Sequence, residues 1–146
     1  MRHAIALAAF TASLAALFPA AQAADTRQSI EMPAPMQEHM LANMRDHLTA
    51  LGEIQTALAG GKYDQAADIA EKRIGMISLQ AHDASHMAPF MPKPMQDIGT
   101  AMHHTASRFA RTAQEAAVTS DLPRTLGALA GLTQQCVACH AGYRVH

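Results

Sequence analysis

The sequence predicts an all-α protein built as an antiparallel bundle of four helices, and three observations predict it. Apolar residues recur at spacings of three and four along most of the chain after residue 35, which is the period of an amphipathic helix. A glycine pair, a proline-rich segment and a short Ser-Asp link separate these stretches. Only 4% of the residues are aromatic and tryptophan is absent, which disfavours a β-sheet protein. The 146 residues suffice for one domain.

The first 23 residues have the pattern of a secretory signal peptide. Met1-Arg2-His3 is a basic start, Ala4 to Leu17 is apolar, and Ala21-Gln22-Ala23 has the small-x-small form that signal peptidase cleaves. The apolar run is shorter than the roughly 20 residues needed to span a bilayer, so we expect no stable membrane anchor. We predict cleavage after Ala23, export to a bacterial periplasm and one domain over residues 24–146. The formal net charge of −1 gives no reason to expect nucleic acid as a partner.

The mature chain begins with a polar lead-in, Ala24 to Pro35, and then turns helical. One apolar face of the first expected helix comprises Met36, Met40, Met44, His47, Leu51, Ile54 and Leu58. Gly60-Gly61 ends this helix.

Asp64 is the expected N-cap of the second helix, which we predict to extend to about residue 81. Its expected buried face is narrow and consists of Ala67, Ala70, Ile74, Ile77 and Ala81. Three prolines then exclude a regular helix over residues 84–94, namely Pro89, Pro92 and Pro94. This segment is predicted to be a crossover loop.

The third helix is expected from Met95 to Val118, and Ser120 or Asp121 is expected to cap the fourth. The inward face of the third helix is predicted to contain Met95, Ile98, Met102, Phe109, Ala113 and Ala116. On the fourth helix the predicted inward residues are Leu122, Leu126, Leu129, Leu132, Cys136, His140 and Tyr143.

A Cys-x-x-Cys-His motif, Cys136 to His140, lies near the end of this fourth helix. It is the attachment signature of a c-type haem, because two thiols at this spacing can add to the vinyl groups of one porphyrin and the next histidine can bind its iron. A redox-active disulfide would need a βαβ context, and structural zinc would need further ligands at characteristic spacing. Since neither is found, the sequence predicts one covalent haem c on the C-terminal helix.

A haem motif on the last of four helices, followed by Tyr143 and Arg144, resembles the class II cytochromes c, the cytochrome c-prime family. The resemblance implies thioether bonds at Cys136 and Cys139 and His140 as the proximal iron ligand. It places Arg144 near the haem edge, although Arg144 can also be a solvated arginine that is favourable at a helix C-terminus. Family members often form homodimers through their first two helices.

The resemblance constrains the distal iron ligand less than it constrains the proximal ligand. Many relatives have an arginine one turn before the residue over the distal haem face, and Met36 stands at that place here. Low-spin relatives use a methionine as the distal ligand, and Met40 has the matching position. Met44, Met36 and His47 share the same helical stripe, and the absence of a sixth ligand is a further alternative.

The region from His82 to His104 is rich in histidine and methionine, which suits copper, especially Cu(I), in an exported protein. The eight residues are His82, His86, Met87, Met91, Met95, Met102, His103 and His104. The interpretation that we favour is methionine in packing and histidine at the surface.

The predicted function is electron transfer between periplasmic redox partner proteins by a haem with His/Met ligation. The alternatives are a five-coordinate haem that binds nitric oxide or carbon monoxide, and a copper-handling cytochrome. An enzyme is not expected, because no set of nucleophile, base and orienting residue is evident.

Overall fold

The computed structural model describes residues 24–145, so the predicted signal peptide lies outside the described residues. The prediction of an all-α protein is confirmed, since helices account for most of the described chain. The elements in chain order are β1 (Gln28–Ile30), α1 (Ala34–Ala59), α2 (Tyr63–Arg73), the 3-10 helix η1 (Met76–Leu79), α3 (Ala84–Met87), the 3-10 helix η2 (Ala88–Phe90), α4 (Lys93–Thr119), α5 (Leu122–Gly142) and β2 (Tyr143–Val145).

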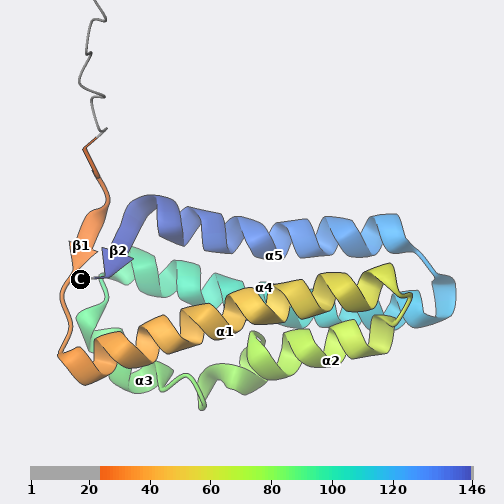
Figure 1. Ribbon diagram of the computed structural model, residues 1–146, viewed down its shortest axis with the longest axis horizontal. Helices are drawn as coiled ribbons and strands as arrows, with labels where there is room; N and C mark the ends of the chain where they lie inside the picture. The colour runs from red at the N-terminus through yellow and green to blue at the C-terminus, as the bar shows by residue number, and fades with distance from the viewer. Residues whose placement is uncertain (1–23, 146) are drawn as a thin grey trace, which may run out of the picture.

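The four long helices follow one another in alternating directions (Figure 1). Helix α1 packs against α2, α2 against α4, and α4 against α5. The beginning of α1, the short helix α3 and the end of α5 therefore lie at the same end of the molecule as β1 and β2 (Figure 1). This end holds every residue that the sequence assigned to the haem.

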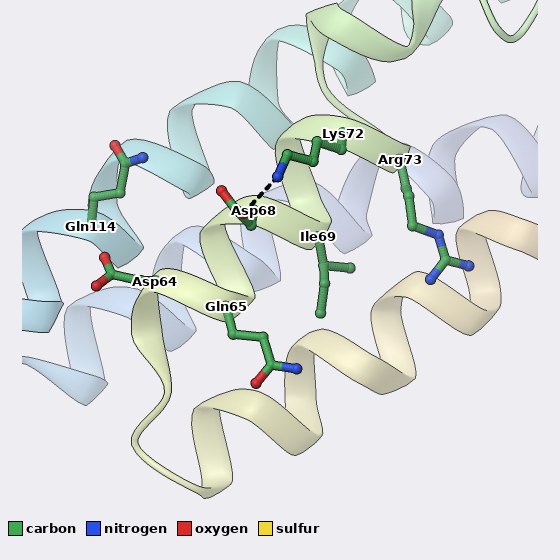
Figure 2. Close-up of a pocket in the computed structure, with 7 residues that line it drawn as sticks. All are labelled: Asp64, Gln65, Asp68, Ile69, Lys72, Arg73 and Gln114. Carbon is green, nitrogen blue, oxygen red and sulfur yellow. Dashed lines mark hydrogen bonds and ion pairs between the residues drawn. The ribbon is translucent and has the colours of Figure 1, made fainter.

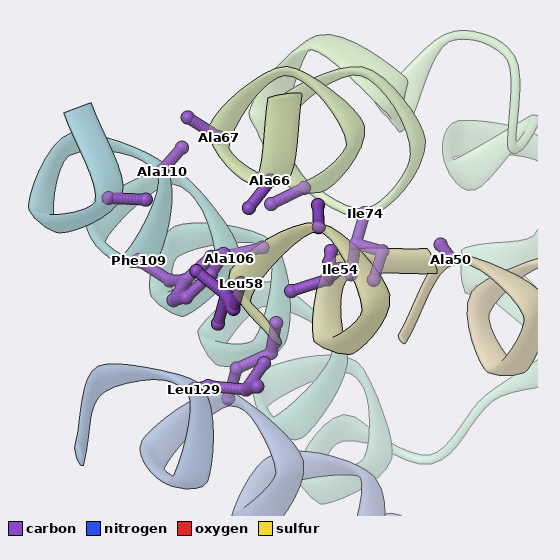
Figure 3. Close-up of a cluster of buried hydrophobic side chains, with 14 of the residues drawn as sticks. Ala50, Ile54, Leu58, Ala66, Ala67, Ile74, Ala106, Phe109, Ala110 and Leu129 are labelled. Atoms are coloured by element: carbon purple, nitrogen blue, oxygen red, sulfur yellow. The ribbon is translucent and has the colours of Figure 1, made fainter. Parts of the chain in front are cut away.

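A core of mostly small side chains holds the long helices together (Figure 3). Phe109 of α4, Ile54 of α1 and Leu132 of α5 are fully buried there. Each such side chain stabilises the fold by about 1.5–3 kcal/mol when it leaves water. The fully buried residues of helix α2 are the small Ala66, Ala67 and Ala70, which allow its neighbours to approach closely.

The predicted extension of the second helix to residue 81 is wrong. Helix α2 ends at Arg73, and an added Cβ on Gly75 would lie 2.8 Å from backbone atoms of Glu71. The chain therefore turns tightly where only glycine fits. Ile77, predicted to be buried, is 68% exposed in η1. Asp64 is not the N-cap either, because it lies within the first turn of α2.

The segment between α2 and α4 contains more helix than predicted. Residues Ala84–Met87 form one turn of α-helix, and Ala88–Phe90 form a 3-10 turn that includes Pro89. Proline is tolerated in a first turn, where its missing N–H has no helical partner. The same reason lets Pro94 stand at the start of α4.

The fourth expected helix is confirmed, together with one of its two predicted caps. The Asp121 carboxylate accepts a hydrogen bond of 3.0 Å from the backbone N–H of Arg124. The predicted inward face is wrong at two residues, since Leu126 and His140 are exposed. These two side chains are exposed because α5 packs mainly against α4 and its other side is only partly covered.

A pair of short parallel strands was not expected from the sequence. Residues Gln28, Ser29 and Ile30 of the lead-in pair with Tyr143, Arg144 and Val145. Ile30 is thereby buried against side chains at the start of α1 and α4. Three residues in each strand are too few to show an alternating pattern in the sequence.

Among the described residues, no helix combines the length and the apolar character needed to cross a membrane.

Candidate functional site

A second buried cluster, separate from the main core, lies at the end of the molecule where α5 terminates. We call it the methionine cluster. Its buried members are Ile30, Met40, Met87 and Met95, and partly buried Met32, Met36, Met44, Met91, Cys139, Tyr143 and Val145 pack against it. Methionine is flexible and polarisable, so such a cluster adapts its shape to what it contacts.

The two cysteines of the haem motif are free thiols and half-buried on α5. Cys139 packs against the methionine cluster, whereas Cys136 packs against the main core. Burial raises the pKa of both thiols. His140 is exposed, since no element within residues 24–145 covers that side of the last turn of α5.

Two adjoining cavities flank Cys139. The C-terminal cavity, of about 280 Å³, is lined by Arg27, Met40, Leu41, Met44, Met95, Cys139, His140, Tyr143, Arg144 and Val145. The histidine cavity, of about 110 Å³, is lined by Met40, Asn43, Met44, His47, His82, Ala84, Met87, Met91, Met95, Gly99, Met102, His103 and Cys139. Four residues line both, namely Met40, Met44, Met95 and Cys139. Three of these four are flexible methionines, so their side chains can move to merge the two spaces.

The four residues that the sequence offered as distal-ligand candidates differ in which cavity they line. Met40 is 5% exposed and lines the C-terminal cavity together with His140. Met44 lines the same cavity, so it has the same access. Met36 packs against the methionine cluster but lines neither cavity, and His47 lines only the histidine cavity.

Arg144 lies at the C-terminal cavity with a donor that has no acceptor. Its Nε atom is buried without a hydrogen-bond partner, and the closest ionic partner, Asp25 Oδ2, is 3.6 Å away. Asp25 is already engaged by Arg27 through bonds of 2.9 and 2.7 Å, and this pairing lowers the pKa of Asp25. The guanidinium of Arg144 beside this cavity suits a ligand that carries a carboxylate, whereas that of Arg27 is already paired with Asp25. Free thiols, thioethers and this unpaired donor together fit haem c.

Three histidines that the sequence did not group together lie around the histidine cavity. His47, His82 and His103 are 5%, 7% and 7% exposed, and the ring centroids of His47 and His82 lie 4.7 Å apart. The centroid of His103 is 5.4 Å from that of His82. The interpretation of the histidines as surface residues is therefore wrong for His82 and His103. His86 and His104 are exposed as expected.

The buried imidazoles are held neutral. Burial, reinforced by the neighbouring imidazoles, lowers the pKa of His47 from 6.5 to about 4. Burial also lowers the pKa of His82 and of His103. The sequence gives no sign of this group, because His47 lies on α1, His82 in the crossover and His103 on α4.

A larger open groove of about 610 Å³ lies elsewhere, over α2 and α4 (Figure 2). Asp68 and Lys72 in this groove pair with each other at 2.6 Å, and Arg73 pairs with Asp46 and Glu53 of α1. These ion pairs tie up Asp68, Lys72 and the partly buried Arg73, so these side chains are engaged with one another or with α1. No group of three or more His, Cys, Asp or Glu side chains is arranged to hold a metal ion within residues 24–145.

Comparison with known proteins gives no match: no family model, no curated protein and no solved structure matches the chain.

Proposed function

We propose that this chain is an exported class II cytochrome c, a four-helix bundle that carries single electrons through one covalently attached haem. The observation that carries the proposal is the position of the Cys-x-x-Cys-His motif. It ends α5 beside a cavity that is also lined by Met40 of α1 and by two arginines. Residues of α1 (Met40, Leu41 and Met44) and of α5 (Cys139 and His140) line this cavity together, and the proposal places the haem there.

Each residue has a stated role in this proposal. Cys136 and Cys139 would hold the haem through thioether bonds, and His140 and Met40 would bind its iron. The Nε donor of Arg144, which lacks a partner, binds a carboxylate of the bound group. Haem c supplies a one-electron iron couple.

Electron transfer is favoured over gas binding by the surroundings of the cavity. Met40 and Met44 both line this cavity from one helix, and in this proposal the thioether of Met40 closes the distal position. His/Met ligation tends to raise the potential of the iron, and the apolar methionine cluster further favours the less charged ferrous state. The physiological partners are then periplasmic redox proteins that approach this end of the molecule.

The attachment is tested by intact mass after expression with a cytochrome c maturation system. We expect a chain that begins at Ala24 and carries the mass of one haem, and that keeps its colour through acid–organic extraction. The Cys136→Ala/Cys139→Ala variant is expected to lose the colour on extraction. A wild-type chain without haem, or one that retains residues 1–23, would contradict the proposal.

The distal ligand is tested with the matched pair Met40→Leu and Met44→Leu. We expect the wild type to be low-spin with a weak sulfur-to-iron band in the far red. Only Met40→Leu is expected to lose this band, become high-spin and bind carbon monoxide. If only Met44→Leu has this effect, Met44 is the ligand. A wild type that is already high-spin and binds the gas readily would replace electron transfer by nitric oxide or carbon monoxide binding.

A further inference from the structure

The histidine cavity holds two imidazole nitrogens at a separation that suits a metal ion. Nε2 of His47 and Nε2 of His82 are 3.4 Å apart, and both side chains are buried. With metal–nitrogen bonds of about 2.0–2.1 Å, two nitrogens at this distance subtend about 110° at the metal. This angle lies within the range of trigonal and tetrahedral coordination, so the separation of the two nitrogens suits one metal ion bound to both.

Surrounding hydrogen bonds fix the ring of His82 in the tautomer that such a site needs. The only hydroxyl proton of Ser78 is donated to the backbone carbonyl of Gly75 at 2.7 Å. Ser78 Oγ, 3.3 Å from Nδ1 of His82, can therefore only accept a hydrogen bond from that nitrogen. The proton of neutral His82 is then on Nδ1, and Nε2 has a free lone pair. This is the outer-shell arrangement that orients metal-binding histidines.

The lining of the cavity selects the kind of ion. Its thirteen lining residues include no Asp, Glu, Lys or Arg, and five of them are methionines besides Met40. A divalent cation in such an uncharged, apolar space would be strongly disfavoured, whereas a soft monovalent ion costs less and binds thioethers. Zinc would also want four protein ligands, while Cu(I) is satisfied by two or three.

We propose that the histidine cavity is a Cu(I) site in which Nε2 of His47, Nε2 of His82 and a thioether of a methionine lining the same cavity bind the ion. In the chain without copper, the Nε2–H of His47 donates a hydrogen bond to Nε2 of His82. On binding, the single proton of neutral His47 resides on Nδ1. The site does not require the haem, so its failure would leave the proposed electron-transfer function untouched.

The test is a titration of the purified protein with Cu(I) under anaerobic conditions, against a chromogenic Cu(I) chelator. Any attached haem is reduced beforehand, so that iron does not oxidise the copper. We expect one Cu(I) per chain, and an affinity that falls by at least about 100-fold in His47→Gln and in His82→Gln, since even outer-shell changes cost 10–100-fold. The exposed pair His86→Gln and His104→Gln should bind as the wild type does.

Two further measurements make the result independent of misfolding in a variant. Cu(I) should raise the unfolding temperature of the wild type and of His104→Gln but not of His47→Gln, since binding to the folded state stabilises it. X-ray absorption of the complex should show both nitrogen and sulfur bound to copper. The proposal is wrong if His47→Gln and His82→Gln bind Cu(I) as tightly as the wild type, if the exposed histidines carry the binding, or if sulfur is absent from the first shell.

Discussion

Acidification should destabilise this protein through His47, by an amount that follows from its burial. The pKa of the imidazole is lowered from 6.5 to about 4 in the folded state, mainly by burial and then by His82 and His103. Asp46 and Arg73 are the charged groups near it; Asp46 raises the pKa and Arg73 lowers it. Each tenfold change in proton affinity corresponds to about 1.4 kcal/mol, so neutral His47 contributes about 3 kcal/mol of stability at neutral pH.

The direction of the effect follows from which state binds the proton more readily. Between pH 6.5 and 4 the unfolded chain protonates this imidazole and the folded chain does not. The contribution is therefore complete above pH 6.5, is lost as the pH falls to about 4, and changes no further below that. His82 and His103, whose pKa values are lowered too, add to the loss.

The assay is urea unfolding of the protein in the presence of a metal chelator, at several pH values between 7.5 and 4. Over this range the free energy of unfolding of His47→Gln should fall by about 3 kcal/mol less than that of the wild type, since the group that titrates has been removed. His104→Gln is the matched control, because its imidazole is exposed on the same helix as His103. Parallel pH profiles for the wild type and His47→Gln would refute the assignment of a buried neutral imidazole.

Two matched pairs of substitutions and one single substitution test the fold, with the free energy of unfolding in urea as the measurement. Phe109→Ala should cost about 3–5 kcal/mol because it leaves a cavity in the main core, whereas Leu48→Ala, at a side chain that is 72% exposed, should cost almost nothing. Gly75→Ala should cost about 1–3 kcal/mol by crowding the backbone of α2, while Gly52→Ala, with open space around it in α1, should stabilise by about 0.5–1 kcal/mol. The opposite result for either glycine would contradict the packing around it. Asp121→Ala should cost about 1 kcal/mol through loss of the N-cap, and an unchanged stability would show that the cap is not formed in solution.

The long helices could be predicted from the sequence because their signals are local. Gly60-Gly61 ends α1 where expected, and Asp121 caps α5 as one of the two predicted residues. The second helix could not be predicted correctly, because Ile74 and Ile77 continue a helical spacing across the turn at Gly75. That turn depends on close contact between backbone segments, which apolar spacing does not report.

Only the part of the candidate site around the Cys-x-x-Cys-His motif could be predicted from the sequence. Cys136 to His140 are adjacent in sequence, so their chemistry can be read directly, and Met40 and Arg144 do line the cavity beside them. The buried histidines come from three separate segments and meet only through tertiary packing. No spacing rule connects residues that the fold alone brings together.

From the pairing of β1 with β2 we expect a particular order of assembly. These strands join the beginning and the end of the described chain, and Tyr143, Arg144 and Val145 of β2 line the C-terminal cavity. Contacts between such distant parts of a chain form late, because they require most of the intervening chain to be in place. The cavity therefore stays accessible to a large group until the strands close, and pulse-labelled hydrogen exchange should show the amide of Ser29 gaining protection after those of α4.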